Sequence, residues 1–313
     1  MNVAIVGAGF SGCLLFNRLK ENGFDITIFD KSRGTGGRLS TKYIEDKFID
    51  HGTPFIKTQD KFLIEFLDEK VLENLLNKKN NEYFPINGIN KLCSSMIDKS
   101  SLIKNSRIKK AFYENKKWTL IDENQQLFEG YDFLVLTNPA KQILELDLKL
   151  SENIKNSLES VYYDSIVSLI CYSNKNCGID LSKLENNKNI KKVVNNSLKY
   201  EYKDFDSYII HFNEEFSNKY CNNSKEEIFD KVYNIINKEL DTEIKKSFET
   251  IEHLWKYAFA KNSLNKDFLF DESIMLGVCG DYFKYKNLES SFHSSLKLSE
   301  KITILQNNKE TKC

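Results

Sequence analysis

The sequence predicts an α/β fold in which a central parallel sheet and a β-meander are interleaved with a smaller α+β domain. A short apolar run at 2–6 precedes a glycine turn, a helical pattern and a second β-rich run at 26–29, which together form a β-turn-α-β unit. Two later apolar runs, 131–136 and 274–279, have the uninterrupted hydrophobicity of strands buried on both faces of a parallel sheet. We therefore expect the chain to leave and rejoin one sheet.

The segments between these strands predict the remaining elements. Residues 59–79 carry apolar side chains at helical spacing, and residues 107–130 alternate between apolar runs and turns, as in an antiparallel meander. From about residue 143 to 265, strand-like runs alternate with a helix-like run, which predicts a second, α+β lobe. The expected boundaries are a Rossmann-type nucleotide-binding domain of residues 1–60, 87–142 and 266–313, and a substrate domain of residues 61–86 and 143–265.

The composition argues against several classes of partner. Lys+Arg and Asp+Glu each number 45, so the formal net charge is zero and neither nucleic acid nor an acidic membrane surface is expected as a partner. No apolar run reaches the ~18–20 residues of a membrane span, and no basic leader precedes an apolar run. The 7 cysteines show no metal-ligand spacing, which predicts reduced thiols in a cytoplasmic protein without a metal, and Cys313 does not lie in a prenylation box.

The glycine turn predicts a dinucleotide site. In the pattern Gly7-x-Gly9-x-x-Gly12, the first glycine permits a tight turn, the second lets the backbone approach a pyrophosphate, and the third lets the helix pack on the strand. Ser11 of this turn is also assigned to the cofactor, and the N-terminus of the helix that follows offers free N–H groups to phosphate. Asp30 ends the second strand, 18 residues after Gly12, and can accept hydrogen bonds from ribose hydroxyls. The alternative is a plain glycine turn with a solvated aspartate.

A second glycine-rich loop follows Asp30 and Lys31 at once. Its residues are Arg33-Gly34-Thr35-Gly36-Gly37-Arg38. Arginine forms charge-assisted, forked hydrogen bonds with phosphate oxygens, and the amide of a residue such as Gly37 can line a flavin edge. A protein that binds only NAD has no need of this loop, so the loop favours FAD. The alternative is a mobile surface loop with two solvated arginines.

Residues near the C-terminus predict a further cofactor contact. Gly280-Asp281 ends an apolar strand just before a helix. Asp281 can accept from the ribityl hydroxyls, and the helix N-terminus would favour the negative charge that a flavin gains on reduction. The alternative is a turn that only caps the helix.

Two further segments carry site candidates, the first for the cofactor site and the second for the substrate pocket. His51, followed by Gly52, is a polar residue in an apolar segment and lies either near the flavin or in the core. His253, Trp255 and Tyr257 share one face of a strand by period two, and this face either lines the substrate pocket or packs in the core. His211 and His293 are assigned no role.

In their order along the chain, these motifs resemble the renalase-like branch of the FAD-dependent amine oxidase superfamily. Asp30–Arg38 resembles its flavin-binding fingerprint, and Asp132–Gln142 resembles its strand ending in Pro-Ala-x-Gln. Thr53-Pro54 replaces the family's Ala-Gln, and Lys256 replaces its arginine, both on the expected substrate side. The other matching segments are Phe48–Phe55, Asn195–Ser197, Glu214–Ser217, His253–Ala258 and Gly280-Asp281.

The resemblance implies an oxidoreductase with non-covalently bound FAD, which accepts a hydride from a small-molecule substrate. Members similar to renalase oxidise isomers of reduced nicotinamide nucleotides. Two alternatives stay open: an amine oxidase or desaturase of the same fold, and a flavin- or nucleotide-binding redox sensor without turnover. The substrate, the electron acceptor and the oligomeric state are not determined by these motifs.

Overall fold

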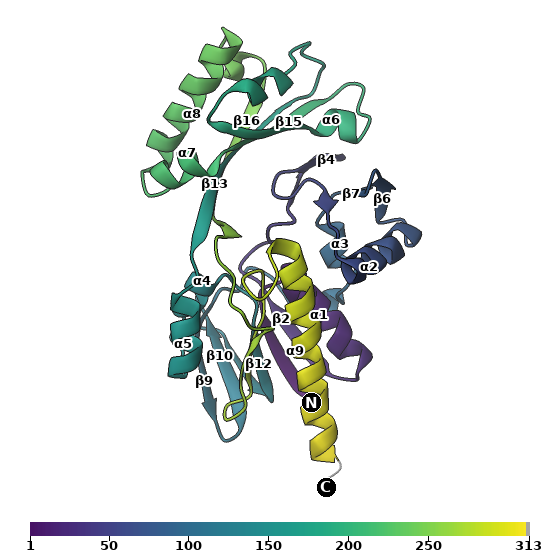
Figure 1. Ribbon diagram of the computed structural model, residues 1–313, viewed down its shortest axis with the longest axis vertical. Helices are drawn as coiled ribbons and strands as arrows, with labels where there is room; N and C mark the ends of the chain where they lie inside the picture. The colour runs from purple at the N-terminus through teal and green to yellow at the C-terminus, as the bar shows by residue number, and fades with distance from the viewer. Residues whose placement is uncertain (311–313) are drawn as a thin grey trace.

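The computed structural model describes residues 1–310 and shows two lobes, one above the other in Figure 1. The six-stranded sheet of the lower lobe comprises β1 (Asn2–Val6), β2 (Asp25–Phe29), β8 (Leu102–Ile103), β12 (Phe133–Leu136), β17 (Leu269–Asp271) and β18 (Leu276–Val278). Their order is β17-β18-β12-β1-β2-β8, and all neighbours are parallel except β17 and β18. The two late apolar runs therefore join the N-terminal sheet, and the α/β fold class is confirmed.

One face of this sheet is covered by helices. α1 (Phe10–Glu21) follows the glycine turn, and α9 (Asn287–Glu310) lies beside it (Figure 1). Phe16 of α1 and Leu298 of α9 share a core cluster with Val3 of β1. The start of α1 is thus fixed from two sides, by the sheet and by α9.

The other face is covered by the antiparallel meander that the sequence predicted over 107–130. β9 (Ile108–Glu114), β10 (Lys117–Asp122) and β11 (Leu127–Tyr131) form an antiparallel sheet in the order β11-β10-β9. Its Trp118 shares a second core cluster with Ala4 and Val6 of β1. α4 (Ala140–Leu144) and α5 (Glu152–Glu159) extend this cluster through Ile143 and Leu158.

Several short elements fill the segment between β2 and β8. They are β3 (Thr41–Ile44), β4 (Lys47–Asp50), β5 (Ile56–Lys57), α2 (Lys61–Leu72), β6 (Leu76–Lys79), β7 (Glu82–Pro85), α3 (Lys91–Ser94) and the 3-10 turn η1 (Lys99–Ser101). The helix predicted over 59–79 is wrong in its second half, because Asn74 adopts φ +57° and the chain then pairs β6 with β7. Phe66 of α2 contacts Phe10 and Phe292. The division of the chain into two domains stays a prediction.

The upper lobe is an antiparallel sheet with helices on one face, which agrees with the predicted α+β character. Its strands are β13 (Tyr163–Ser173), β14 (Ile190–Asn195), β15 (Asp206–Phe212) and β16 (Glu249–Ala260), in the order β14-β15-β13-β16. The remaining elements are α6 (Asn196–Lys199), α7 (Glu214–Tyr220), α8 (Lys225–Leu240), η2 (Ser182–Asn186) and η3 (Ile244–Lys246).

The two faces of the upper sheet have different neighbours. On one face, Val167 and Ile210 pack with Val232 of α8 in one core cluster. On the opposite face, Ile170 and Ile209 pack against Ile49 of β4. Alternate residues of β13 and β15 therefore point either to the helices or to the lower lobe, and the face toward the lower lobe is available to a site between the two.

Two further expectations concern membranes and cysteines. Within residues 1–310, no helix has both the length and the hydrophobicity needed to cross a membrane. The 6 cysteines in this range are free thiols. Cys313 lies outside the described residues.

Candidate functional site

The glycine turn follows β1 at the carboxyl edge of the parallel sheet, beside the ends of β2 and β12. Gly7 has φ +109°, and a Cβ atom there would lie 2.5 Å from Thr137 Oγ1. A Cβ at Gly12 would lie 1.9 Å from the carbonyl oxygen of Gly7. At Gly9 the nearest such atom, the Gly36 carbonyl oxygen, is 4.0 Å away. Packing thus requires glycine at the first and third positions, whereas the second leaves the backbone open to a ligand.

The first turn of α1 begins without a side-chain cap. Its N-cap is Gly9, so no side chain satisfies the free N–H groups of the first turn. Ser11 is buried, and its carbonyl oxygen accepts a 3.1 Å hydrogen bond from Ser295 Oγ of α9. The backbone of the turn is therefore held in place from behind while its N–H groups stay unpaired with side chains.

Asp30 joins the glycine turn to the second loop. Its Oδ2 accepts from the backbone N–H of Ala8 at 2.7 Å, and its Oδ1 accepts from the backbone N–H of Ser32 at 2.7 Å. Lys31 reaches Gln142 with its Nζ at 3.4 Å, and Arg33 is exposed. Asp30 lies at the predicted place, but both of its oxygens are bonded to the chain's own donors.

The second loop packs directly on the first. Gly36 is buried, forms a bridge with Gly9, and donates its N–H to the Ala8 carbonyl at 2.9 Å. Gly37 adopts φ +57°, and a Cβ there would lie 3.3 Å from the Gly9 Cα. The two loops together form one glycine-rich surface, although Arg33 of the second loop is exposed, as the alternative expected for its arginines.

Arg38 and Asp281 form a forked ion pair. Nη1 and Nη2 of Arg38 each donate to one Asp281 oxygen at 2.6 Å. Nη1 also donates to the Ala258 carbonyl of β16 at 3.2 Å. Asp281 is 5% exposed and Arg38 is 32% exposed. One guanidinium thus connects the second loop, the C-terminal motif and the upper lobe, and the two residues that the sequence assigns separately to the cofactor meet at one place.

Serines of α9 hold the peptide groups of Gly280. Ser294 Oγ accepts from the Gly280 N–H at 3.0 Å, and Ser290 Oγ donates to the Gly280 carbonyl at 2.9 Å. Ser290 and Ser294 were not predicted as site residues. The signal that could have found them is the pair of Ser-Ser steps four residues apart, which places these hydroxyls on one helix face.

Asn138 is a further polar residue at this edge that the sequence did not single out. It follows β12, and its backbone carbonyl accepts from the Tyr282 hydroxyl at 3.2 Å. Its side-chain Oδ1 is buried, and no described residue hydrogen-bonds to it. A dinucleotide fits this edge, because its phosphates match the free N–H groups of α1 and its hydroxyls could satisfy an acceptor such as Asn138.

Three of the chain's four histidines meet between the lobes. The His51 ring stacks on Trp255, with 5.4 Å between ring centroids, and the His253 ring lies 4.1 Å from Trp255. His211, which the sequence left without a role, donates from Nε2 to the His51 carbonyl at 3.1 Å. We call His51, His211, His253 and Trp255 the histidine cluster. No group of metal-ligating side chains suited to a metal ion occurs in the part of the chain that the structure describes.

The histidine cluster is uncharged near neutral pH. Burial lowers the pKa of His51 to about 3 and that of His211 to about 4. Burial also lowers the pKa of His253. The charged side chains that act on these rings, and that lower their pKa values further, are Lys42, Lys191, Lys192 and Lys225.

These shifts predict acid sensitivity. An unfolded histidine titrates near pH 6.5, so between about pH 6.5 and pH 4 the unfolded state binds more protons than the folded state. The free energy of unfolding should therefore fall as the pH falls through this range, by up to about 1.4 kcal/mol per pH unit for each histidine. Urea titrations at several pH values measure this slope. An equal slope in the His51→Asn/His211→Asn double variant would contradict the assignment.

Tyr257 lies apart from the other two predicted pocket rings. Its ring contacts Tyr163 at 5.3 Å, and its carbonyl accepts from Arg38 at 3.4 Å. The pairing of β13 with β16 shifts register between Asp164 and Ile166, so period two does not extend along the strand to Tyr257. A hollow of about 460 Å³ borders Tyr257, and its other lining residues are Lys141, Tyr162, Tyr163, Ser165, Asn218, Cys221, Lys256 and Lys261.

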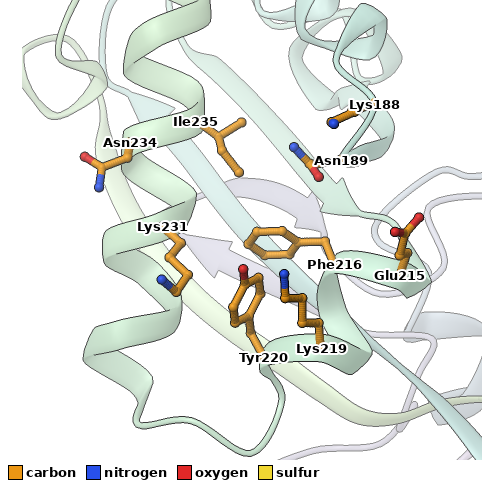
Figure 2. A pocket seen from close by; sticks show the side chains of 9 residues that line it. All are labelled: Lys188, Asn189, Glu215, Phe216, Lys219, Tyr220, Lys231, Asn234 and Ile235. Atoms are coloured by element: carbon orange, nitrogen blue, oxygen red, sulfur yellow. The ribbon is translucent and has the colours of Figure 1, made fainter.

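A second hollow, of about 600 Å³, lies on the helical side of the upper sheet (Figure 2). α7 and α8 form its sides, and the Phe216 and Tyr220 rings point into it. The other lining residues are Lys188, Asn189, Glu215, Lys219, Lys231, Asn234 and Ile235. None of the site residues predicted from the sequence lines this hollow.

Known proteins share this fold. Residues 5–69 match the family of NAD(P)-binding Rossmann-like domains. A protein named as a protoporphyrinogen oxidase, from Exiguobacterium sp. 255-15, is similar with a TM-score of 0.71 and 10% identity over 97% of this chain and 99% of that chain. Putrescine oxidase bound to putrescine is similar with a TM-score of 0.68 and 10% identity over 96% and 99%.

A third similar structure is a fatty acid isomerase from P. acnes that produces CLA, with a TM-score of 0.66 and 11% identity over 96% of this chain and 98% of that chain. The three names cover three different reactions. The similarity therefore establishes the fold, and the reaction has to be argued from the residues of this chain.

Proposed function

We propose that this chain is an FAD-dependent, renalase-like oxidoreductase that oxidises a small molecule by hydride transfer to the flavin. The observation that carries the proposal is the fusion of two glycine loops into one surface, completed by the Arg38–Asp281 fork. A dinucleotide site needs only the first loop, whereas the second loop and the C-terminal motif provide the additional contacts that a flavin requires. The free thiols of the described residues support the cytoplasmic location that belongs to this proposal.

The residues present would divide the binding of FAD among them. The N–H groups of the α1 first turn would hold the diphosphate, and Asp30 would exchange a backbone partner for ribose hydroxyls. Gly280 would let the backbone approach the cofactor, with its peptide fixed by Ser290 and Ser294. When bound, FAD would supply the acceptor for the hydride.

The histidine cluster favours an uncharged donor over a protonated amine. A cationic substrate needs a carboxylate nearby, because an unpaired buried charge is costly. Glu252 is the acid next to His253 along β16, and it is engaged by the Tyr233 hydroxyl at 2.9 Å and by Lys225 at 3.3 Å. A dihydronicotinamide is uncharged at its ring and can release a hydride without proton abstraction, so this site would need to orient the donor but would not need a base.

Replacing Trp255 by alanine tests the substrate pocket. Loss of this ring should slow anaerobic reduction of the flavin by the donor by at least tenfold, because stacking no longer holds the donor near the 3–3.5 Å required for transfer. The affinity for FAD should change much less. Stopped-flow reduction with candidate dihydronicotinamide nucleotides measures the rate, and FAD titration measures the affinity.

Phe259→Ala is the matched control, because Phe259 is a partly exposed ring on the same strand outside the histidine cluster. The flavin of this variant should be reduced by the donor at the wild-type rate. If the donor reduces the flavin of a stably folded Trp255→Ala protein at the wild-type rate, Trp255 serves core packing instead. Rapid reduction by simple amines would favour an amine oxidase, and a flavin that no donor reduces would favour a sensor.

A further inference from the structure

Ser168 lies at the centre of a polar row that crosses the upper sheet. In β13 it is directly opposite His211 of β15 on one side and His253 of β16 on the other. Residues directly opposite each other on neighbouring strands share a face of the sheet. The next row along β13 contains Ile170, which packs against Ile49 of β4. The row of Ser168 therefore faces the lower lobe, and Ser168 itself is 0% exposed.

Three buried polar atoms in and beside this row have no hydrogen-bond partner. They are Ser168 Oγ, His51 Nδ1 and Trp255 Nε1. His51 and Trp255 stack on each other, and Trp255 contacts His253, which is opposite Ser168. Buried polar groups are nearly always paired, and an unsatisfied one costs about 1–3 kcal/mol. Three such atoms in one connected cluster indicate that a bound polar group completes it.

The chemistry of these atoms restricts that group. The Trp255 N–H can only donate, and the Ser168 hydroxyl can both donate and accept. His51 Nδ1 can do either, because His51 Nε2 shares a 2.7 Å hydrogen bond with the Ser40 hydroxyl, which can act in both directions. A matching group therefore needs a hydrogen-bond acceptor for the Trp255 indole. It also needs a donor or an acceptor for each of Ser168 and His51.

The group should also be uncharged. None of the ion pairs formed by the described residues includes a member of the histidine cluster or Ser168. A buried ammonium would lack an anion, and the nearby lysines Lys42, Lys191, Lys192 and Lys225 would oppose it. A buried carboxylate would lack a cation in contact with it, because none of these lysines forms an ion pair within the cluster. A carboxamide has one acceptor oxygen, two donor hydrogens and no charge.

We propose that Ser168, His51 and Trp255 form a subsite that binds an uncharged carboxamide group of the substrate. This proposal rests on the proposed function, which places the substrate beneath this face of the upper sheet. It goes further in assigning Ser168 and in naming the chemical group that the face recognises.

Three ligands that share a benzene ring but differ in charge test the subsite. Benzamide carries the neutral carboxamide, benzoate an anion and benzylamine a cation. Titration calorimetry of the purified protein, as isolated with its cofactor, should show benzamide binding at least tenfold more tightly than either of the others. Weaker binding of benzamide than of benzylamine or benzoate, or no binding of benzamide, would overturn the proposal.

Two serine variants separate recognition from stability. Ser168→Ala should weaken benzamide binding about tenfold, the effect of losing one hydrogen bond, but should leave the thermal stability of the free protein unchanged or higher. Ser217, also 0% exposed and in the same lobe, accepts from the Val167 N–H at 2.9 Å. Ser217→Ala should therefore lower stability without changing benzamide affinity. If Ser168→Ala instead lowers stability and leaves the affinity unchanged, the hydroxyl binds a structural water and the proposal fails.

These experiments distinguish failure of the carboxamide subsite from failure of the proposed flavoenzyme function. If the protein holds no FAD yet binds benzamide through Ser168, the subsite stands and the flavoenzyme proposal fails. If FAD is bound and reducible but benzamide affinity is independent of Ser168, the subsite fails and the flavoenzyme proposal stands.

Discussion

Replacing Lys199 by methionine should destabilise the protein by about 3–5 kcal/mol, the cost of leaving one member of a buried ion pair without its partner. Lys199 is 7% exposed and Asp50 is 0% exposed, and they form a short ion pair. Asp50 also accepts from the Tyr200 hydroxyl and, at 2.9 Å, from the Ile89 N–H. Lys199 donates further to the Pro54 carbonyl at 3.2 Å. The pair therefore links α6 of the upper lobe to the end of β4.

Equilibrium urea unfolding of wild type and variant measures this effect. Lys297→Met is the matched control, because Lys297 pairs with Glu300 on the exposed surface of α9, where such a pair contributes about 0–1 kcal/mol. Equal stabilities of the two lysine variants would show that the Lys199–Asp50 pair does not hold the lobes together.

Replacing Arg38 by alanine should weaken FAD binding by about 1.5–3 kcal/mol, the range for hydrogen bonds to charged groups. The same change leaves Asp281, which is 5% exposed, without its cation. The negative charge of Asp281 would then lie unneutralised in the proposed cofactor site, which adds to the loss. Arg38→Lys keeps the charge but not the fork, so its affinity should be intermediate.

Titration of apoprotein with FAD measures the affinity of each arginine variant. Arg18→Ala is the control, because Arg18 pairs with Glu21 on the exposed side of α1. It should bind FAD as tightly as wild type. Wild-type affinity in Arg38→Ala would remove Arg38 from the cofactor site and leave it only a structural role between the lobes.

The Rossmann-like β-turn-α-β unit could be predicted because its signals are local. The turn from Gly7 to Gly12, α1 and β2 follow one another before residue 30, and the glycine positions carry their own backbone requirements. β12 and β18 could be placed in the same sheet because uninterrupted apolar runs of that length need burial on both faces. The order of strands in the sheet was not specified by these runs.

The contacts that complete the candidate site join residues far apart in the sequence. No local sequence pattern therefore predicts which residues meet. Arg38 and Asp281 are 243 residues apart, and His211 reaches His51 over 160 residues. Ser168 is one of many serines in apolar runs, and its position opposite His211 and His253 depends on a register that period two does not reveal. The register shift opposite the segment after Trp255 was equally invisible in the sequence. Because of this shift, Tyr257 does not share the face of His253 and Trp255, as period two had predicted.

We propose that the two glycine loops and the Arg38–Asp281 fork hold FAD. The most direct test is the absorption spectrum of the purified protein, followed by release of its cofactor with acid and identification of that cofactor by chromatography. We expect a yellow protein whose released cofactor is FAD, in about one equivalent per chain. A colourless protein that cannot be reconstituted with FAD, yet binds NAD tightly, would contradict the claim.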